Sequence, residues 1–169
     1  MTQEGIVLLA IGLLVVGVAA LAFVWSLYHD YLEKEKRLYR EPSFVPAGFW
    51  MSRLPQQDYL RLDRIYLLGR RIAQLEFLVR PQWTAVLLVA FEGQDLRLEE
   101  WEMPDFDQLS VRMVAGVRTE LRQEQNGAVL VRWQRNGFDF ALYLPRTEMG
   151  LAGGLLERFV TDTQASPLE

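Results

Sequence analysis

The chain has 169 residues, of which 50% are hydrophobic and 12% aromatic, and its formal net charge is −4. This composition supports a folded core and excludes a chain that is disordered over most of its length, while the acidic balance disfavours nucleic acid as a partner. The chain contains no cysteine, which excludes disulfides, thiolate metal sites and a cysteine nucleophile.

The first predicted element is an apolar helix over residues 6–25, a run of twenty residues without a charge. At about 1.5 Å per residue this helix is roughly 30 Å long, which matches the thickness of a bilayer core. The residues before it contain no Lys or Arg, and the run is longer than the apolar part of a signal peptide. The pattern predicts an uncleaved single-pass transmembrane helix, preceded by a short tail over residues 1–5, with membrane lipid as a partner.

The charges that flank this run indicate which side of the membrane holds the rest of the chain. No basic residue precedes the run, and four follow it, at Lys34, Lys36, Arg37 and Arg40. Since Lys and Arg near a span favour the cytoplasmic side, this flank predicts a cytoplasmic domain. The helical spacing of its charges also predicts a juxtamembrane helix over residues 26–41, which Pro42 ends.

A soluble domain is predicted over residues 42–163. Residues 60–68 and 72–79 are two apolar segments around Gly69, and their side chains suit a helix as well as a strand, so their type stays open. Residues 84–91 form a continuous apolar run of strand length, which a turn over residues 92–95 follows.

The clearest local pattern lies in the last third, where Asn126-Gly127 and Asn136-Gly137 stand ten residues apart. Asn-Gly tolerates the positive φ angles of the type I′ turn, which joins neighbouring antiparallel strands. Apolar and polar residues alternate in three segments, over 117–122, 129–134 and 138–144. This alternation predicts a three-stranded antiparallel meander with one apolar face and one mainly polar face.

The last predicted element is a short amphipathic helix over residues 150–163. Leu151, Leu155 and Phe159 form one apolar stripe at helical spacing. The polar residues 164–169 that follow are expected to form a flexible tail.

Three short motifs resemble a known family. They are Pro46-Ala47-Gly48-Phe49 after the apolar run, Val114-Ala115-Gly116-Val117 in a β-turn-β unit, and residues 131–142, which contain Trp133 and Gly137. Their order resembles the uncharacterised domain that follows the membrane span of many bacterial anti-sigma and sigma-regulator proteins. That domain is related to curved-sheet periplasmic sensors and lipoprotein carriers.

The resemblance implies a curved antiparallel sheet and a position outside the cell, opposite to the side that the flanking charges predict. Only five residues precede the apolar run, so an anti-sigma domain on the other side of the membrane is not expected. The predicted fold class is α+β: a transmembrane helix, then a domain with a curved antiparallel sheet and a C-terminal helix.

Side chains that usually carry catalysis or hold a metal are sparse. His29 is the only histidine, and it lies far along the chain from any serine that it would activate. The acidic residues over 99–107 offer oxygen ligands to Ca²⁺, but their spacing matches no calcium loop, so a solvated edge is the preferred interpretation. We expect no enzymatic activity, no cofactor and no metal site.

Arginines are the candidate interaction residues, because they suit lipid headgroups or an acidic partner. Pairing with local acids such as Glu120 is the alternative. Two of these arginines, Arg70 and Arg71, directly follow Gly69. The other four lie on the predicted meander: Arg118, Arg122, Arg132 and Arg135.

The expected function is that of a non-catalytic, membrane-anchored module for interaction, sensing or assembly, such as an accessory subunit with a membrane-protein partner. The alternative is binding of an apolar ligand such as lipid on the concave side of the curved sheet. Trp83, Trp101 and Trp133 would either line such a groove or pack in the core.

Overall fold

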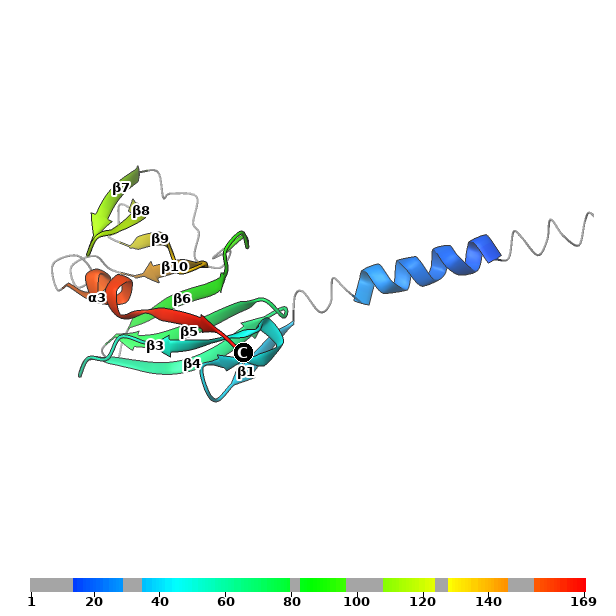
Figure 1. Ribbon diagram of the computed structural model, residues 1–169, viewed down its shortest axis with the longest axis horizontal. Coiled ribbons are helices and arrows are strands. Elements are labelled where there is room, and N and C mark those ends of the chain that lie inside the picture. The colour runs from blue at the N-terminus through cyan, green and yellow to red at the C-terminus, as the bar shows by residue number, and fades with distance from the viewer. Residues whose placement is uncertain (1–13, 29–34, 80–82, 97–107, 124–127, 146–153) are drawn as a thin grey trace, which may run out of the picture. The chain divides into compact units, whose positions relative to one another are not determined.

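The computed structural model describes residues 14–28, 35–79, 83–96, 108–123, 128–145 and 154–169 (Figure 1). The chain divides into two compact units, Met1–Glu35 and Lys36–Glu169. The second unit contains all of the strands and the helix α3, so it extends beyond the predicted domain over 42–163 at both ends.

In the first unit, residues 14–28 form a helix whose side chains are all exposed. Among the described residues, no helix is long and apolar enough to span a membrane. The predicted transmembrane helix over 6–25 and the single-pass membrane localisation, on either side, are therefore wrong. Residues 6–13 of that range lie outside the described residues.

The predicted juxtamembrane helix over 26–41 is wrong in its last part, where Lys36–Tyr39 forms the strand β1. This strand pairs antiparallel with β4 (Leu60–Leu68), and Tyr39 lies opposite Ile65. The Tyr39 ring also contacts the Phe44 ring, with centroids 5.6 Å apart. Pairing with a distant strand outweighs the local helical spacing of charges, because it satisfies main-chain groups and places Tyr39 against the core. Residues 29–34 lie outside the described residues.

Eight strands form one antiparallel sheet in the order β1-β4-β5-β6-β10-β9-β8-β7. After β4 the chain continues with β5 (Ile72–Val79), β6 (Trp83–Phe91), β7 (Gln108–Val114), β8 (Val117–Gln123), β9 (Val129–Arg135) and β10 (Phe138–Leu144). The predicted meander is confirmed as β8, β9 and β10. The two segments whose type the sequence leaves open are the strands β4 and β5, because each pairs with a strand on both sides.

Two-residue turns close two of the hairpins. Asn136 and Gly137 join β9 to β10 with φ angles of 53° and 79°, as the Asn-Gly pattern predicts. Ala115 and Gly116 join β7 to β8 with φ angles of 50° and 78°. The turn predicted at Asn126-Gly127 lies outside the described residues.

A second layer covers one face of the large sheet (Figure 1). It contains the helix α3 (Leu155–Asp162) and a three-stranded sheet in the order β11-β3-β2, formed by β2 (Ser43–Phe44), β3 (Phe49–Arg53) and β11 (Gln164–Pro167). The 3-10 helix η1 (Val45–Ala47) joins β2 to β3. The predicted flexible tail over residues 164–169 is therefore wrong, because β11 pairs with β3.

The main core lies between the large sheet and this second layer. Phe77 of β5 packs edge-on against Phe159 of α3, with ring centroids 5.1 Å apart. Phe49 of β3 contacts Phe138 of β10 at 5.4 Å. A smaller apolar cluster lies on the opposite face and includes Val86, Leu88, Ala90, Leu96, Ala128, Leu130 and Ala141.

The described part of the second unit is mostly β-sheet, so the predicted α+β class is wrong. Its α-helix, α3, has only eight residues. The sequence underestimates strand because residues at both ends of the unit, which were expected as a helix at β1 and as a flexible tail at β11, become strands through pairing with segments far away in the chain.

Candidate functional site

The strands β8, β9 and β10 present two chemically different faces. Side chains such as Leu121, Val131 and Phe140 point into the main core. Since successive strand residues point to opposite faces, the residues between them lie on the outer face of the sheet. These outer residues are largely charged or polar: Arg118, Glu120 and Arg122 on β8, Arg132 and Gln134 on β9, and Asp139 on β10.

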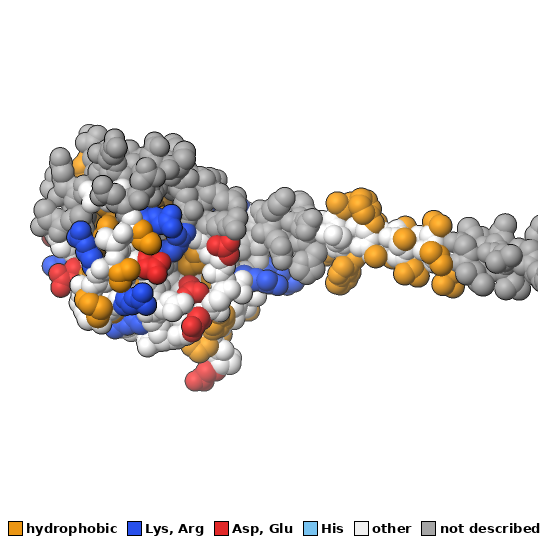
Figure 2. Space-filling view, turned by 90° about the horizontal axis from the view of Figure 1, so that it is seen from above, with side chains coloured by type: hydrophobic (Ala, Val, Ile, Leu, Met, Phe, Trp, Pro, Cys, Tyr) orange, Lys and Arg blue, Asp and Glu red, His pale blue; other side chains and the backbone are white. Residues whose placement is uncertain are grey.

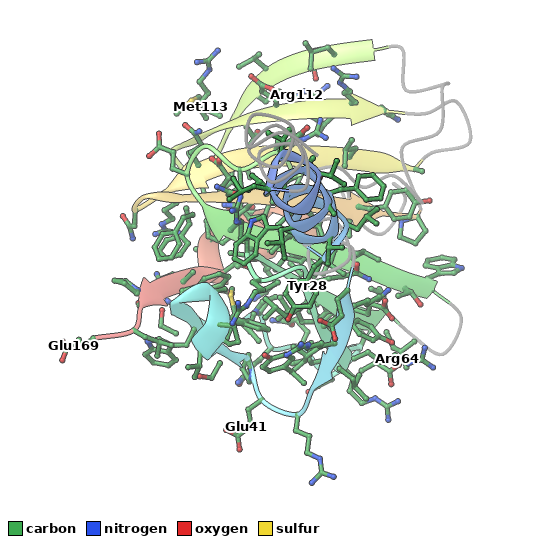
Figure 3. The ribbon with its side chains drawn as sticks, turned by 90° about the vertical axis from the view of Figure 1, so that its right-hand side faces the viewer. Tyr28, Glu41, Arg64, Arg112, Met113 and Glu169 are labelled. Atoms are coloured by element: carbon green, nitrogen blue, oxygen red, sulfur yellow. The ribbon has the colours of Figure 1, made fainter. Side chains whose placement is uncertain are left out.

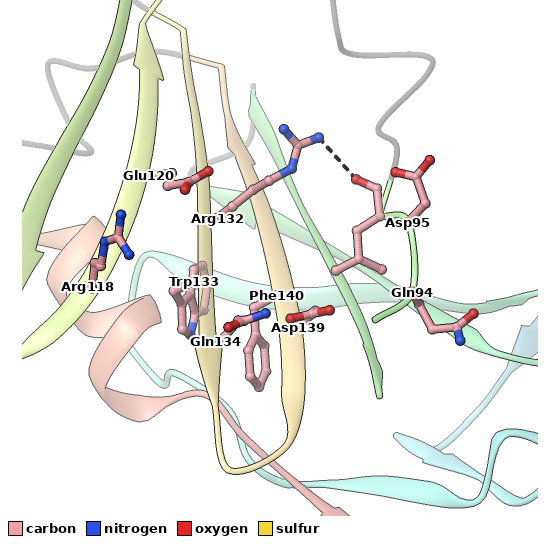
Figure 4. Close-up of a pocket in the computed structure, with 10 residues that line it drawn as sticks. Gln94, Asp95, Arg118, Glu120, Arg132, Trp133, Gln134, Asp139 and Phe140 are labelled. Atoms are coloured by element: carbon pink, nitrogen blue, oxygen red, sulfur yellow. Dashed lines mark hydrogen bonds between the residues drawn. The ribbon is translucent and has the colours of Figure 1, made fainter. Parts of the chain in front are cut away.

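A pocket of about 520 Å³ opens on this outer face (Figure 4). Its floor is the sheet, and one wall is the loop that follows β6. The lining residues are Gln94, Asp95, Leu96, Arg118, Glu120, Arg132, Trp133, Gln134, Asp139 and Phe140. The volume lies within the usual range for sites that bind small molecules, about 300–1,000 Å³.

Hydrogen bonds to main-chain groups of the loop hold this wall against the sheet. The Gly93 N–H donates to Oδ2 of Asp139 at 2.8 Å, and the Glu92 N–H donates to the Gly137 carbonyl at 2.9 Å. The Nη2 group of Arg132 donates to the Leu96 carbonyl at 3.2 Å (Figure 4). These contacts come from two strands and one loop, and they hold the side chains of Arg132 and Asp139 in place against the loop.

Strand register places opposite charges side by side across the pocket floor. Glu120 lies opposite Arg132 in the β8–β9 ladder, and Gln134 lies opposite Asp139 in the β9–β10 ladder. Directly opposite residues of an antiparallel pair have Cβ atoms about 4.5–5.5 Å apart, so their side chains interact. The site therefore carries both signs of charge. Figure 2 likewise shows basic, acidic and apolar side chains interspersed on the face that it presents.

The two aromatic residues that border the pocket belong mainly to the core. Trp133 is 3% exposed, and its ring stacks on Phe140 with centroids 5.1 Å apart and planes 4° apart. Trp83 packs at the edge of the same core, whereas Trp101 lies outside the described residues. The described tryptophans thus support packing of the core rather than an aromatic ligand groove.

An apolar stripe adjoins the charged row of β8. Leu109, Val111 and Met113 of β7 lie opposite Arg122, Glu120 and Arg118, respectively, so they share the outer face of the sheet. These three side chains are 57%, 53% and 67% exposed. The outer face therefore continues from the pocket, across the charged row, to an exposed apolar edge.

The structure separates the six predicted arginines into three groups. Arg118 and Arg132 line the pocket, and Arg122 lies beside it on β8. Arg70 and Arg71 are exposed in the turn between β4 and β5, away from these strands along the chain and in the sheet order. Arg135 points to the core side, where it donates to the Val160 and Thr161 carbonyls at 3.2 and 3.0 Å.

The acidic and amide residues of the site were not among the predicted interaction residues. Glu120, Gln134 and Asp139 occupy polar positions of the predicted alternation, and this pattern already indicates that they share the polar face with the arginines. The sequence predicted the loop residues Gln94 and Asp95 only as part of a turn.

None of the described lining residues is one of the candidate metal or catalytic residues. Within the described ranges, no group of three or more His, Asp or Glu side chains could hold a metal ion. His29 and the acidic residues 99–107 lie outside the described residues. Comparison with protein families, curated proteins and solved structures found no match to this chain. The resemblance to the anti-sigma-associated domain stays a prediction.

Proposed function

We propose that the unit Lys36–Glu169 is a non-catalytic recognition module that binds a partner protein on the outer face of β8, β9 and β10. The observation that carries this proposal is the pocket of about 520 Å³, which is lined by arginine and carboxylate groups and in which Arg132 and Asp139 are hydrogen-bonded to the loop after β6. Preorganised charged groups lower the ordering cost of binding and select partners by charge.

The chemistry of the lining indicates what the partner presents. Arg118 is exposed and suits a carboxylate of the partner, since guanidinium groups bind carboxylates through two hydrogen bonds. Glu120 and Asp139 suit a basic or amide side chain. A protein segment with both kinds of side chain fits this site better than a ligand with a single charge.

The alternative function, binding of an apolar ligand by the sheet, receives less support. The apolar face of the large sheet is filled in the described structure by side chains of the second layer, among them Phe44, Phe49 and Phe159, each 0% exposed. The pocket on the outer face is lined mainly by charged and amide groups. An apolar ligand would remove water from these polar groups and offer them no hydrogen bonds in return.

The described lining also favours recognition over catalysis. It consists of arginine, carboxylate, amide and core side chains, and it contains no hydroxyl, thiol or imidazole group. Nucleophilic catalysis usually relies on one of these groups next to a base.

Site-specific photocrosslinking of the full chain at native expression tests the proposal. A photoreactive residue at Arg122, which is exposed beside the pocket, should give a discrete adduct with another protein, whereas the same residue at Arg70 should not. Glu120→Arg should abolish the Arg122 adduct by reversing a charge of the site, and the matched variant Glu157→Arg, on the exposed side of α3, should leave it intact. An adduct that forms equally from Arg70, or that persists in Glu120→Arg, would contradict the proposal. An adduct between two copies of this chain does not count as the partner.

A further inference from the structure

The two edges of the large sheet are built differently. The edge strand β1 has four residues and carries Lys36 and Arg37, and short strands with basic residues resist pairing with another sheet. The other edge strand, β7, has seven residues, and its register with β8 contains no bulge. It lacks Lys and Pro, and its only charged residue is Arg112. Figure 3 shows Arg112 and Met113 at this outer end of the sheet.

The ladder with β8 determines which main-chain groups β7 presents outward. Val114 and Val117 close a two-residue turn, so this pair exchanges both of its hydrogen bonds. Because the pattern alternates, Arg112 and Ser110 also direct their main-chain groups toward β8. The N–H and C=O groups of Leu109, Val111 and Met113 therefore point to the outer edge, where no strand of the described residues pairs.

We propose that β7 pairs antiparallel with β7 of a second copy of this chain, centred on Val111 and related by a two-fold axis. In this register Leu109 lies opposite Met113 of the second copy, and Val111 lies opposite Val111. These are the three residues whose main-chain groups point outward, so every outward group is matched. Pairing centred on Ser110 or on Arg112 would match only two of the three residues.

The side chains of β7 fit the same register. Partnered residues of an antiparallel pair share a face, so the stripes of Leu109, Val111 and Met113 from two copies merge into one apolar strip. On the other face, Arg112 lies opposite Ser110 of the second copy, whereas a register centred on Arg112 would place two arginines opposite each other. Like charges directly opposite are destabilising, so both polarity and charge select Val111 as the centre.

The symmetry of this dimer has a consequence for the outer face. A two-fold axis perpendicular to the sheet keeps the same face of both copies on the same side. The dimer therefore presents two copies of the pocket beside one shared apolar strip. The dimer itself rests on β7 and does not depend on the function proposed for the pocket.

Cysteine crosslinking of the full chain tests both the pairing and its register, because the natural chain has no cysteine. In a hydrogen-bonded antiparallel pair the Cα atoms are about 5.5 Å apart, which lies within the range that a disulfide bridges. Val111→Cys should form an intermolecular disulfide rapidly under mild oxidation. Leu109→Cys mixed with Met113→Cys should crosslink faster than either variant alone. The control is Leu38→Cys on β1, whose native side chain is 69% exposed; it should crosslink only at the rate of random collisions.

The oligomeric state provides a second measurement, by sedimentation of the full chain over a range of concentrations. Val111→Lys places two like charges opposite each other at the centre and should weaken the dimer by about tenfold or more, whereas Leu38→Lys should leave it unchanged. Circular dichroism should show that both variants remain folded. Three results would overturn the proposal: a monomer at all concentrations, association that Val111→Lys does not weaken, or a Val111→Cys crosslink no faster than that of Leu38→Cys.

Discussion

Ala115 and Asn136 occupy equivalent positions in two hairpin turns, with φ angles of 50° and 53°. A left-handed backbone is costly for alanine, because its Cβ approaches the following carbonyl, and it is tolerated by asparagine. The two turns therefore differ in how well their first residue suits the backbone, although their second residue is glycine in both.

Exchanging these two residue types should change stability in opposite directions. We expect Ala115→Asn to raise the free energy of unfolding by about 0.5–1 kcal/mol and Asn136→Ala to lower it by a similar amount. Urea denaturation followed by circular dichroism measures both changes, with each variant serving as the control for the other. Changes of the same sign in both variants would mean that the turns do not share this conformation.

Arg135 has a structural role that its position in the sequence does not reveal. Its guanidinium group donates to two carbonyls in the last turn of α3, where a positive charge also interacts favourably with the helix dipole. We expect Arg135→Ala to destabilise the unit by about 1.5–3 kcal/mol, the range for hydrogen bonds to charged groups. Arg158→Ala, a change of an exposed arginine on the same helix, should have little effect on the melting temperature. Equal effects of the two variants would argue against this role.

The strand β11 shows how a short polar segment becomes part of the fold. It pairs with β3, buries Ala165 to 6% exposure, and is continued by a hydrogen bond from the Leu168 N–H to the Gly48 carbonyl at 2.8 Å. These are contacts with residues more than a hundred positions earlier in the chain. Local composition does not record such contacts, which explains why the tail looks flexible in the sequence.

Removing residues 164–169 should therefore destabilise the unit. We expect a loss of about 2–4 kcal/mol, because several main-chain hydrogen bonds disappear and the edge of β3 becomes exposed. Thermal melting of the truncated chain measures the loss, and removal of Glu169 alone is the matched control. A truncated chain with an unchanged melting temperature would show that β11 contributes nothing to stability.

The helix α3 depends on packing rather than on its own ends. Its N-cap residue is Gly154, which makes no side-chain capping hydrogen bond, and eight residues are marginal for an isolated helix. Leu155, Leu156, Phe159 and Val160 are buried against the core. An ion pair between Arg53 of β3 and Asp162, at 3.0 Å, links the helix to the three-stranded sheet, but such partly exposed pairs contribute little.

The unit Lys36–Glu169 contains its own core. None of the residues in the two apolar clusters belongs to the described part of Met1–Glu35. A fragment of residues 36–169 should therefore fold alone, with a free energy of unfolding within about 0.5 kcal/mol of the full chain. A fragment of residues 41–169, which lacks β1, should be less stable, because it loses the ladder with β4 and the contact between Tyr39 and Phe44. Denaturant melts of the three chains compare them. Failure of the longer fragment to fold would mean that the first unit stabilises the second.

Local sequence patterns are enough to predict the meander and the polarity of its faces. The alternation of apolar and polar residues over β8, β9 and β10 and the Asn136-Gly137 turn are local features of the sequence. They determine which face each side chain occupies and which residues pair across the turn. Two pocket arginines, Arg118 and Arg132, were found in the same way. The acidic balance and the absence of cysteine are likewise properties of the sequence by itself.

Tertiary structure decided the parts that depend on pairing between distant segments. Residues of β1 and β11 form strands because they pair with β4 and β3. Arg135 lies on the core side, whereas Arg118 and Arg132 line the pocket, and the loop after β6 is hydrogen-bonded to Asp139. The physical reason is that register shifts of one residue exchange the two faces of a strand, and register between distant segments is selected by the packing of the whole core. The sequence thus determined which strands carry charge, and the packed sheet determined which charges share one site.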